Sequence, residues 1–467
     1  MASSSAPPRE SWFTPVRLLV VFCVINLINY VDRGAIASNG VNGNPKTCTK
    51  GGKCSGGSGI QGDFNLTNFQ DGVISSAFMV GFLVASPIFA YLAKKFNPFR
   101  LIGVGLTVWT IAITGCGFAI DFWSLAICRM LVGVGEASFV SLAAPYIDDN
   151  APSRKKTAWL GVFYMCIPCG VALGYVYGGL VANHLSWRYA FWIEAGMMVP
   201  FAILGFVMTP LQLKGFVQTE STPAASEGQR ENFLRDVKNI LVDKVYVVNV
   251  IGYTVYNFVI GAYSYWGPKA GYNIYHMKNA DIIFGGVTCI CGVFGTLAGG
   301  FVLDRLSSTI RNSFKLLSVA TLCGGMFCFA AFCFKSLYAF IALFAIGELL
   351  LFATQGPVNF VCLHCVNPSL RPLSMALSTV SIHVFGDVPS SPLVGVLQDH
   401  IKNWRATALI LTSILFLAAL VWCFGIFLHS VDRFNEGIEP EIAPSDRSNT
   451  APSLEDKPIE TNNQSLC

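Results

Sequence analysis

Four ionisable residues stand inside two strongly apolar stretches of this sequence: Asp32, Arg33, Arg129 and Glu136. A charged side chain at the centre of a bilayer costs about 2.5–3.5 kcal/mol on insertion scales. Such residues persist where they face a protein interior or a water-filled cavity, and there they bind ions, move protons or hold anionic groups. The four residues therefore predict proton movement or anion binding inside a membrane.

Spacing and depth indicate how these side chains meet. Arg129 and Glu136 are seven residues apart, so in a helix they share a face and stand about 10 Å apart along its axis. Counted from the predicted inner helix ends, Asp32 and Arg129 lie at a similar depth, and we expect them to pair. Glu136 lies nearer the centre, where we expect fewer positively charged side chains around it.

Burial favours the neutral form of a carboxyl group, which suits a proton carrier. We hypothesise that Glu136, coupled to Asp32, takes up and releases a proton. Arg33 and Arg129 then either pair with these acids or receive an anionic headgroup such as phosphate, which a guanidinium binds through two hydrogen bonds. The alternative is a static charge network that holds two helices together.

A second titratable pair is predicted further along the chain. His383 and Asp387 are one helical turn apart, so their side chains share a face. The alternative is a local hydrogen bond that stabilises a helix interrupted by Pro389 and Pro392.

Two more acids stand in apolar stretches. Glu348 is a candidate for proton coupling. Glu194 is expected to pair with Arg188 near the outer rim, which would make it structural.

One stretch, 245–267, is rich in amphipathic rings: Tyr253, Tyr256, Asn257, Tyr263 and Tyr265. These side chains either line a cavity that takes a polar head and an acyl chain or pack against one another. Glycines in another stretch are spaced for close contact between helices: Gly161, Gly170, Gly174 and Gly178.

The elements that must position these residues are membrane helices. The 467 residues are 53% hydrophobic and 12% charged, whereas soluble domains carry about a quarter charged residues. We predict an all-α membrane protein with 12 transmembrane helices, because that many apolar stretches are long enough to span a bilayer. They are 16–38, 70–95, 100–120, 123–147, 156–182, 188–209, 245–267, 281–304, 314–334, 337–362, 371–398 and 405–429.

Composition also excludes several classes of protein. The net charge of +4, without a basic stripe, argues against nucleic acid as a partner. Most of the 16 Cys lie in apolar stretches, where Cys acts as a small hydrophobe, so we predict no metal and no cofactor. Nucleophile-elbow, zinc-protease and Walker motifs are absent from the sequence, so we predict no enzyme and no catalytic residues.

Lysine and arginine set the predicted orientation. With the N-terminus in the cytosol, the cytosolic loops hold 15 of these residues and the opposite loops nine, which favours both termini in the cytosol. The first outer loop, 39–69, reads as irregular. It carries an N-glycosylation acceptor at Asn65, and its Cys48 and Cys54 would be able to close a disulfide. The alternative is an unmodified flexible loop.

Polar segments divide the chain into two halves of six helices. We predict a cytosolic N-terminus over 1–15, a first half over 16–209, a cytosolic linker over 210–244, a second half over 245–429 and a disordered cytosolic tail over 430–467. Within the linker, apolar spacing over 232–241 indicates a short amphipathic helix on the inner membrane surface.

The two halves echo each other. Ser186-Trp187-Arg188 opens one helix, and Asn403-Trp404-Arg405 opens another 217 residues later. Ala90-Tyr91-Leu92-Ala93-Lys94-Lys95 likewise corresponds to Gly300-Phe301-Val302-Leu303-Asp304-Arg305 after 210 residues. Parallel repeats of this kind place a substrate site at their interface, near the middle of the membrane.

Six plus six helices, with Gly300-x-x-x-Asp304-Arg305 after the eighth, resemble the major facilitator superfamily. Four segments look more narrowly like its spinster family, and like plant members in particular. They are Asn29-Tyr30-x-Asp32-Arg33, Arg129-x6-Glu136-Ala137, Arg371-Pro372-x-Ser374-Met375-Ala376 and His383-x-x-Gly386-Asp387-x-x-Ser390-x-Pro392-x-x-Gly395. The loop after the second helix differs from the superfamily pattern, with Lys94 and Ala90 in place of Asp and Gly.

This resemblance implies a proton-coupled carrier that moves sphingolipids or lysophospholipids by alternating access. In that reading Tyr30 and Asn257 join the arginines near the headgroup, while Asp304 and Arg305 lock the inner gate. We expect a monomer in the membrane of a late endosome, lysosome or vacuole, or in the plasma membrane. A carrier of another organic anion or a sugar, or a sensor without transport, are the alternatives.

Overall fold

The computed structural model describes residues 14–48, 54–93, 96–152, 156–207, 235–277, 279–367 and 370–428. Within these ranges it contains 12 helices that are long and apolar enough to cross a membrane, as predicted. Residues Met1–Phe434 form one compact unit. The predicted N-terminal segment before residue 14, linker residues 208–234 and the tail after 428 lie outside the described residues.

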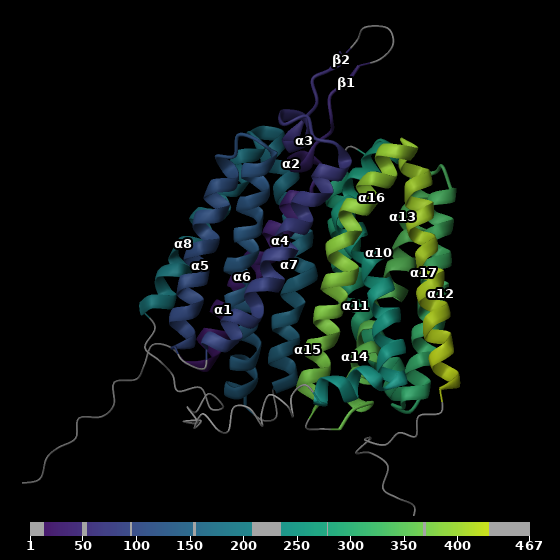
Figure 1. The fold of residues 1–467 in the computed structure, drawn as a ribbon. Coiled ribbons are helices and arrows are strands. Elements are labelled where there is room, and N and C mark those ends of the chain that lie inside the picture. The colour runs from purple at the N-terminus through teal and green to yellow at the C-terminus, as the bar shows by residue number, and fades with distance from the viewer. Residues whose placement is uncertain are drawn as a thin grey trace, which may run out of the picture. The chain divides into compact units, whose positions relative to one another are not determined.

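Six membrane-spanning helices belong to each half (Figure 1). Those of the first half are α1 (Pro15–Ala37), α4 (Asn68–Leu92), α5 (Pro98–Gly117), α6 (Phe122–Asn150), α7 (Lys156–His184) and α8 (Trp187–Val207). Those of the second half are α10 (Lys244–Tyr275), α11 (Ala280–Arg305), α12 (Ile310–Cys333), α13 (Leu337–Phe352) with α14 (Gln355–His364), α15 (Arg371–Ile382) with α16 (Val388–Ile401), and α17 (Trp404–Phe427).

Packing is most extensive within each half. In the first half α1 packs on α7, α4 on α6 and α5 on α8, and in the second half α12 and α10 pack on α17. The halves meet chiefly along two helix pairs, α4 with α16 and α7 with α11. The first-half helices, purple to blue, therefore stand beside the green and yellow helices of the second half (Figure 1).

The corresponding arginines of the two repeated sequence segments, Arg188 and Arg405, make similar contacts in the structure. Arg188, near the start of α8, donates to the carbonyl of Ala119 at 3.1 Å, just past the end of α5. Arg405, near the start of α17, donates to the carbonyls of Phe332 and Phe334 at 3.1 and 2.9 Å, at the end of α12. Each arginine thus supplies donors to carbonyls that a helix end leaves without partners.

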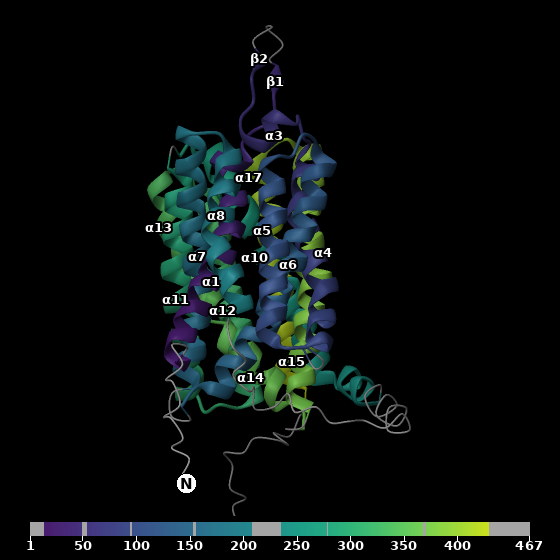
Figure 2. The ribbon, with the colours of Figure 1, turned by 90° about the vertical axis from the view of Figure 1, so that its left-hand side faces the viewer.

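The first loop is more ordered than predicted. It contains α2 (Asn39–Asn42), β1 (Thr47–Cys48), β2 (Cys54–Ser55) and α3 (Gly59–Asp63), so the expectation of an irregular segment was wrong in part. Gly43 and Gly59 take positive φ angles of 76° and 60°, which a residue with a Cβ rarely adopts. We call the end of the bundle that carries this loop the loop face, and the end where α1 begins the terminal face (Figures 1 and 2).

Two candidate modification sites lie in this loop. Backbone pairing sets Cys48 opposite Cys54, a register compatible with a disulfide, although the side chains lie outside the described part of the structure. Asn65 is exposed, with a φ of 50°. Both modifications stay predictions.

Three helices depart from their predicted course. The predicted span 337–362 is broken at Ala353–Thr354, between α13 and α14. The span 371–398 contains a π-helical turn at His383–Asp387, just before the two prolines. α10 continues through Pro268 to Tyr275 instead of ending at 267. In the linker, residues 235–242 are helical, which confirms the described part of the short predicted helix.

Glycines of α7 bring its backbone into contact with α1. The sequence predicted close helix contact at four glycines, and three of them make it. A Cβ added at Gly170, Gly174 or Gly178 would lie within 3 Å of atoms of α1 or the following Ser38. Gly161 was wrongly included, because no atom lies within 4 Å of its added Cβ. This close contact fixes the position of Asp32 and Arg33, which α1 carries.

Gly174→Ala should therefore destabilise the protein. The added Cβ would lie 2.2 Å from the carbonyl oxygen of Val31, and overpacking of this kind costs about 1–3 kcal/mol. Gly161→Ala, on the same helix, is the matched control and should be neutral or gain up to about 1 kcal/mol of helix propensity. The measurement is the melting temperature of purified protein in detergent. Equal melting temperatures for the two variants would contradict the close contact.

Candidate functional site

A cavity of about 230 Å³ lies between the two halves. Tyr30, Arg33 and Arg129 reach it from the first half, and Asn257 and Asp387 from the second. All five were predicted as site residues. The remaining wall is largely apolar: Ile36, Ala37, Phe78, Met79, Ile167, Val171 and Ile260. The cavity is therefore amphipathic, with its cations on one side.

Asp32 and Arg129 form a fully buried ion pair. Nη1 of Arg129, on α6, lies 2.6 Å from Oδ1 of Asp32, on α1. Both side chains are at most 1% exposed. The pairing predicted from helix depth is thus present. A buried charge-assisted bond of this length holds the two helices in one register.

Glu136 has a cationic partner, contrary to the sequence prediction. Its Oε1 lies 2.6 Å from Nη2 of Arg33, and Glu136 is fully buried while Arg33 is 18% exposed. Helix depth predicts the position of each residue's backbone but not how far its side chain extends. An arginine side chain extends about a helical turn from its Cα and so bridges the difference in depth.

Aromatic rings surround Arg33. Its guanidinium carbon lies 4.6 Å from the ring centres of Tyr30 and Phe78 and 5.7 Å from that of Phe82. Cation–π contacts hold the charged group at the cavity wall, where its remaining donors can reach a ligand. Arg33 is therefore the cation best placed to meet an anionic group in the cavity.

The second half brings a titratable pair to the same cavity. Nδ1 of His383 lies 2.7 Å from Oδ2 of Asp387, within the π-helical turn. π-helical turns of this kind occur often at functional sites. The ring of His383 meets that of Phe82 edge-on, with centres 6.1 Å apart. This contact connects the pair to the aromatic residues around Arg33.

Other predicted residues lie elsewhere. Glu348 is buried within the second half, on α13, and does not line the cavity. Of the predicted aromatic and amide side chains on α10, Asn257 and Tyr265 line the cavity, whereas the three other tyrosines pack or bond inside the second half. Asp304 and Arg305 are exposed on the terminal face, and their contacts are local, to Ser308 and Phe301.

Glu194 does not pair with Arg188, so that expectation was wrong. Arg188 donates to Ala119 and lies over the rings of Phe64 and Trp187. Glu194 is fully buried on α8, and neither carboxyl oxygen has a hydrogen-bond partner among the described residues.

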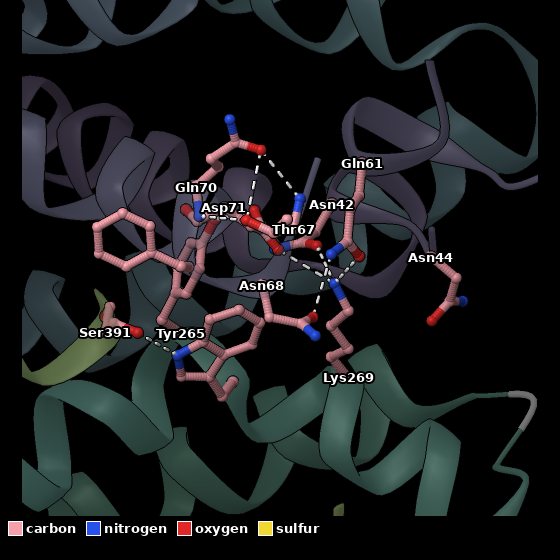
Figure 3. Close-up of polar contacts among 12 residues, drawn as sticks. Asn42, Asn44, Gln61, Thr67, Asn68, Gln70, Asp71, Tyr265, Lys269 and Ser391 are labelled. Atoms are coloured by element: carbon pink, nitrogen blue, oxygen red, sulfur yellow. Dashed lines mark hydrogen bonds and ion pairs between the residues drawn. The ribbon is translucent and has the colours of Figure 1, made fainter. Parts of the chain in front are cut away.

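Sequence reasoning missed a polar cluster that joins the halves at the loop face. Nζ of Lys269, on α10, lies 3.0 Å from Oδ2 of Asp71, on α4, and donates to Asn42 and Gln61 of the first loop (Figure 3). Tyr265 Oη donates to Oδ1 of Asp71 at 2.7 Å. These five residues, the loop-face cluster, are nearly inaccessible to solvent.

The loop-face cluster borders the cavity, because Tyr265 belongs to both. Asn68 on α4 adds another contact between the halves at this face by donating to Asp399 on α16 at 2.7 Å. The sequence signal was Lys269 itself. It lies beyond the predicted span 245–267, after a Gly-Pro pair, which is typical of a turn.

Known proteins resemble this chain over nearly its whole length. The family model of the Major Facilitator Superfamily matches residues 56–386. An Arabidopsis thaliana protein named "Probable sphingolipid transporter spinster homolog 2" is 67% identical, over 96% of this chain and 94% of its own. "Protein spinster homolog 1" of Xenopus tropicalis is 28% identical, over 87% of this chain and 77% of its own.

A solved structure resembles the fold. The crystal structure of a bacterial homolog of the human lysosomal transporter Spinster, described as inward-facing and unoccupied, matches with a TM-score of 0.75. It covers 90% of this chain and 98% of its own, at 16% identity. At that identity the likeness establishes the fold and no more.

The Asp32–Arg129 pair predicts non-additive stability changes. Arg129→Met alone leaves Asp32 buried without its cation, which should cost about 3–5 kcal/mol. Adding Asp32→Asn removes the unpaired charge, so the double variant should recover most of the loss in melting temperature. Lys335→Met, which removes an exposed cation, is the control and should change little. Losses that simply add would show that the pair contributes no coupling.

Proposed function

The chain belongs to the spinster family of the major facilitator superfamily and is a multi-pass membrane transporter of that class; from this premise we propose that it is a proton-coupled carrier of a sphingolipid or lysophospholipid. Its named relatives in Arabidopsis thaliana support the lipid class. The cavity supports an amphiphile, because cations and apolar residues share its wall.

The observation that carries this proposal is the Arg33–Glu136 pair at the cavity wall. While Glu136 is ionised, it neutralises Arg33. Protonation of Glu136 would remove that charge and free the guanidinium to bind an anionic headgroup through two hydrogen bonds. Proton uptake and headgroup binding then favour each other, which is the thermodynamic requirement for coupled movement of a proton and a lipid.

The two faces of the bundle support alternating access. At the loop face, the buried Asp71–Lys269 pair joins the halves. At the terminal face, Asp304 and Arg305 are exposed, and their contacts with described residues are local. We propose that a lock involving them forms after the loop-face cluster has separated. The halves would then rock about the cavity.

The proposed orientation follows the lysine and arginine bias of the loops, which puts both termini in the cytosol. The loop face, with the exposed acceptor Asn65, would then face the lumen or the outside. We propose the membrane of a late endosome, lysosome or vacuole as the location, with the loop face toward the acidic lumen that would supply protons.

Lipid counterflow into proteoliposomes tests the carrier. Labelled lysolipid or sphingolipid should enter vesicles preloaded with unlabelled lipid, and an inward proton gradient should drive accumulation. Glu136→Gln should reduce the gradient-driven accumulation at least tenfold at normal protein yield, because Arg33 loses its proton-dependent partner.

Competition identifies the substrate class in the same assay. Lysolipids should compete, whereas headgroup-only analogues should not. Strong competition by a sugar or a small anion would favour the other carriers, and absence of counterflow in the wild type would favour a sensor.

The loop-face cluster predicts a change in accessibility. Ser264→Cys places a reporter thiol at the cavity wall, in a background from which other reactive cysteines have been removed. Adding Lys269→Met should speed its reaction with an impermeant maleimide applied from the loop face at least fivefold, because the ion pair between the halves is lost. Lys402→Gln, an exposed cation at the same face, is the control. Equal rates for all three proteins would remove the cluster as a gate.

A further inference from the structure

The first half contains a second proton-binding site that the Arg33–Glu136 pair does not account for. We propose that Glu194 carries a proton in this conformation and shares it with Asp32, so that the two carboxyl groups form a proton-binding acid pair. The existence of the pair is independent of the proposed function; only its part in transport rests on it.

Burial is the first observation. Glu194 is 0% exposed on α8, and neither of its carboxyl oxygens has a hydrogen-bond donor among the described residues. Oδ2 of Asp32 is likewise buried and without a donor, although Oδ1 of the same group is bonded to Arg129. An ionised carboxylate in such surroundings costs several kcal/mol unless it is paired, so a buried acid without a cation stays neutral.

Proximity is the second observation. α8 packs on α1, and the carboxyl group of Glu194 lies beside that of Asp32. Two carboxylates are both acceptors and repel each other, whereas a carboxylic acid donates one hydrogen bond to a carboxylate. A single proton on Glu194 therefore removes the repulsion and gives the free oxygen of Asp32 a donor, the O–H of Glu194.

Among the described residues, the ionisable groups near Glu194 already have other partners. The ionisable side chains near Glu194 are Asp32 from α1, Arg129 from α6 and Tyr177 from α7. Arg129 is bonded to Asp32, and the Tyr177 hydroxyl donates to the carbonyl of Ala190. From α5, Cys116 lies near Asp32 and Arg129, and α2 carries no ionisable residue.

Counting charges gives the same answer. Arg129 balances Asp32, and Arg33 balances Glu136. Glu194 is the fifth ionisable group in this part of the first half, and ionising it would leave one uncompensated negative charge in a buried region. A proton on Glu194 brings the net charge to zero.

The position of the acid pair connects it to the cavity. Asp32 is bonded to Arg129, and Arg129 lines the cavity. When the proton leaves, two carboxylates compete for one guanidinium, so the contacts among α1, α6 and α8 must change. Loss of the proton therefore alters the cationic wall that a substrate meets.

Infrared spectroscopy of purified protein tests the acid pair directly. The wild type should show the carbonyl stretch of a protonated carboxylic acid near neutral pH, and Glu194→Gln should remove one carboxyl group's share of it. Gln is isosteric and can donate to Asp32 as the protonated acid does, so the variant should fold. Unchanged intensity in Glu194→Gln would overturn the proposal.

Two further variants distinguish the pair from an isolated buried acid. In Asp32→Asn, Glu194 becomes the counterion of Arg129 and should ionise, so the same share of the band should disappear. In Arg129→Met, Asp32 also becomes protonated, and the band should grow. Tyr177→Phe removes a hydrogen bond between α7 and α8 without touching a carboxyl group, and should leave the band unchanged. If the carbonyl band keeps its intensity in Asp32→Asn, Glu194 and Asp32 do not share the proton.

Transport then tests the role of the site. Glu194→Gln should keep lipid counterflow near the wild-type rate. The accumulation driven by a proton gradient should fall at least tenfold. Glu194→Asp keeps a carboxyl group and should retain part of the coupling. A wild type without counterflow would refute the proposed carrier while the infrared result stands. Full coupling in Glu194→Gln would refute the role of the acid pair in transport.

Discussion

The constraint on which this structure depends is the cost of an uncompensated charge in a low-dielectric interior. Asp32 and Arg33 on α1, Arg129 and Glu136 on α6 and Glu194 on α8 are five ionisable residues inside the first half, and each must be neutral or paired. Because α1 and α7 approach through glycines, the side chains of Asp32 and Arg33 are held where α6 can present Arg129 and Glu136. Removing or adding one proton therefore changes the charge balance of the entire group.

This constraint explains why the pairs are arranged in layers. The Asp71–Lys269 pair lies near the loop face, Asp32 and Arg129 lie deeper, and Arg33 with Glu136 lies at the cavity. The first of these pairs joins the halves, whereas the other two lie within the first half. Separation of the halves thus breaks the first pair, whereas the other two stay formed within the first half; among the described residues, the Asp71–Lys269 pair is the ion pair that opening at the loop face disrupts.

Much of this arrangement was predictable from the sequence. The apolar stretches, the two halves and the Asp32–Arg129 pair follow from hydropathy, repetition and helix depth. Side-chain reach does not follow from them, so helix depth did not assign Arg33 to Glu136, although pairing of Arg33 with an acid was one of the alternatives. Lys269 follows Pro268 and lies beyond the predicted span 245–267, so it was not among the predicted site residues. A proline inside a helix is tolerated when neighbouring groups replace the lost hydrogen bond, and a single sequence does not contain those neighbours.

The two halves contribute different physical properties to the cavity wall: buried charges from the first half and an irregular helix from the second. The first half supplies buried charges, which respond to protons but tolerate little movement without their partners. The second half supplies a π-helical turn at His383–Asp387 followed by Pro389 and Pro392, where backbone hydrogen bonds are already irregular. Such a helix bends at low cost. Asp387 and His383 face the aromatic residues around Arg33. A change in charge in the first half therefore acts next to the irregular, easily bent helix formed by α15 and α16. Coupling between proton and movement is therefore expected at this contact, where electrostatic change and backbone compliance coincide.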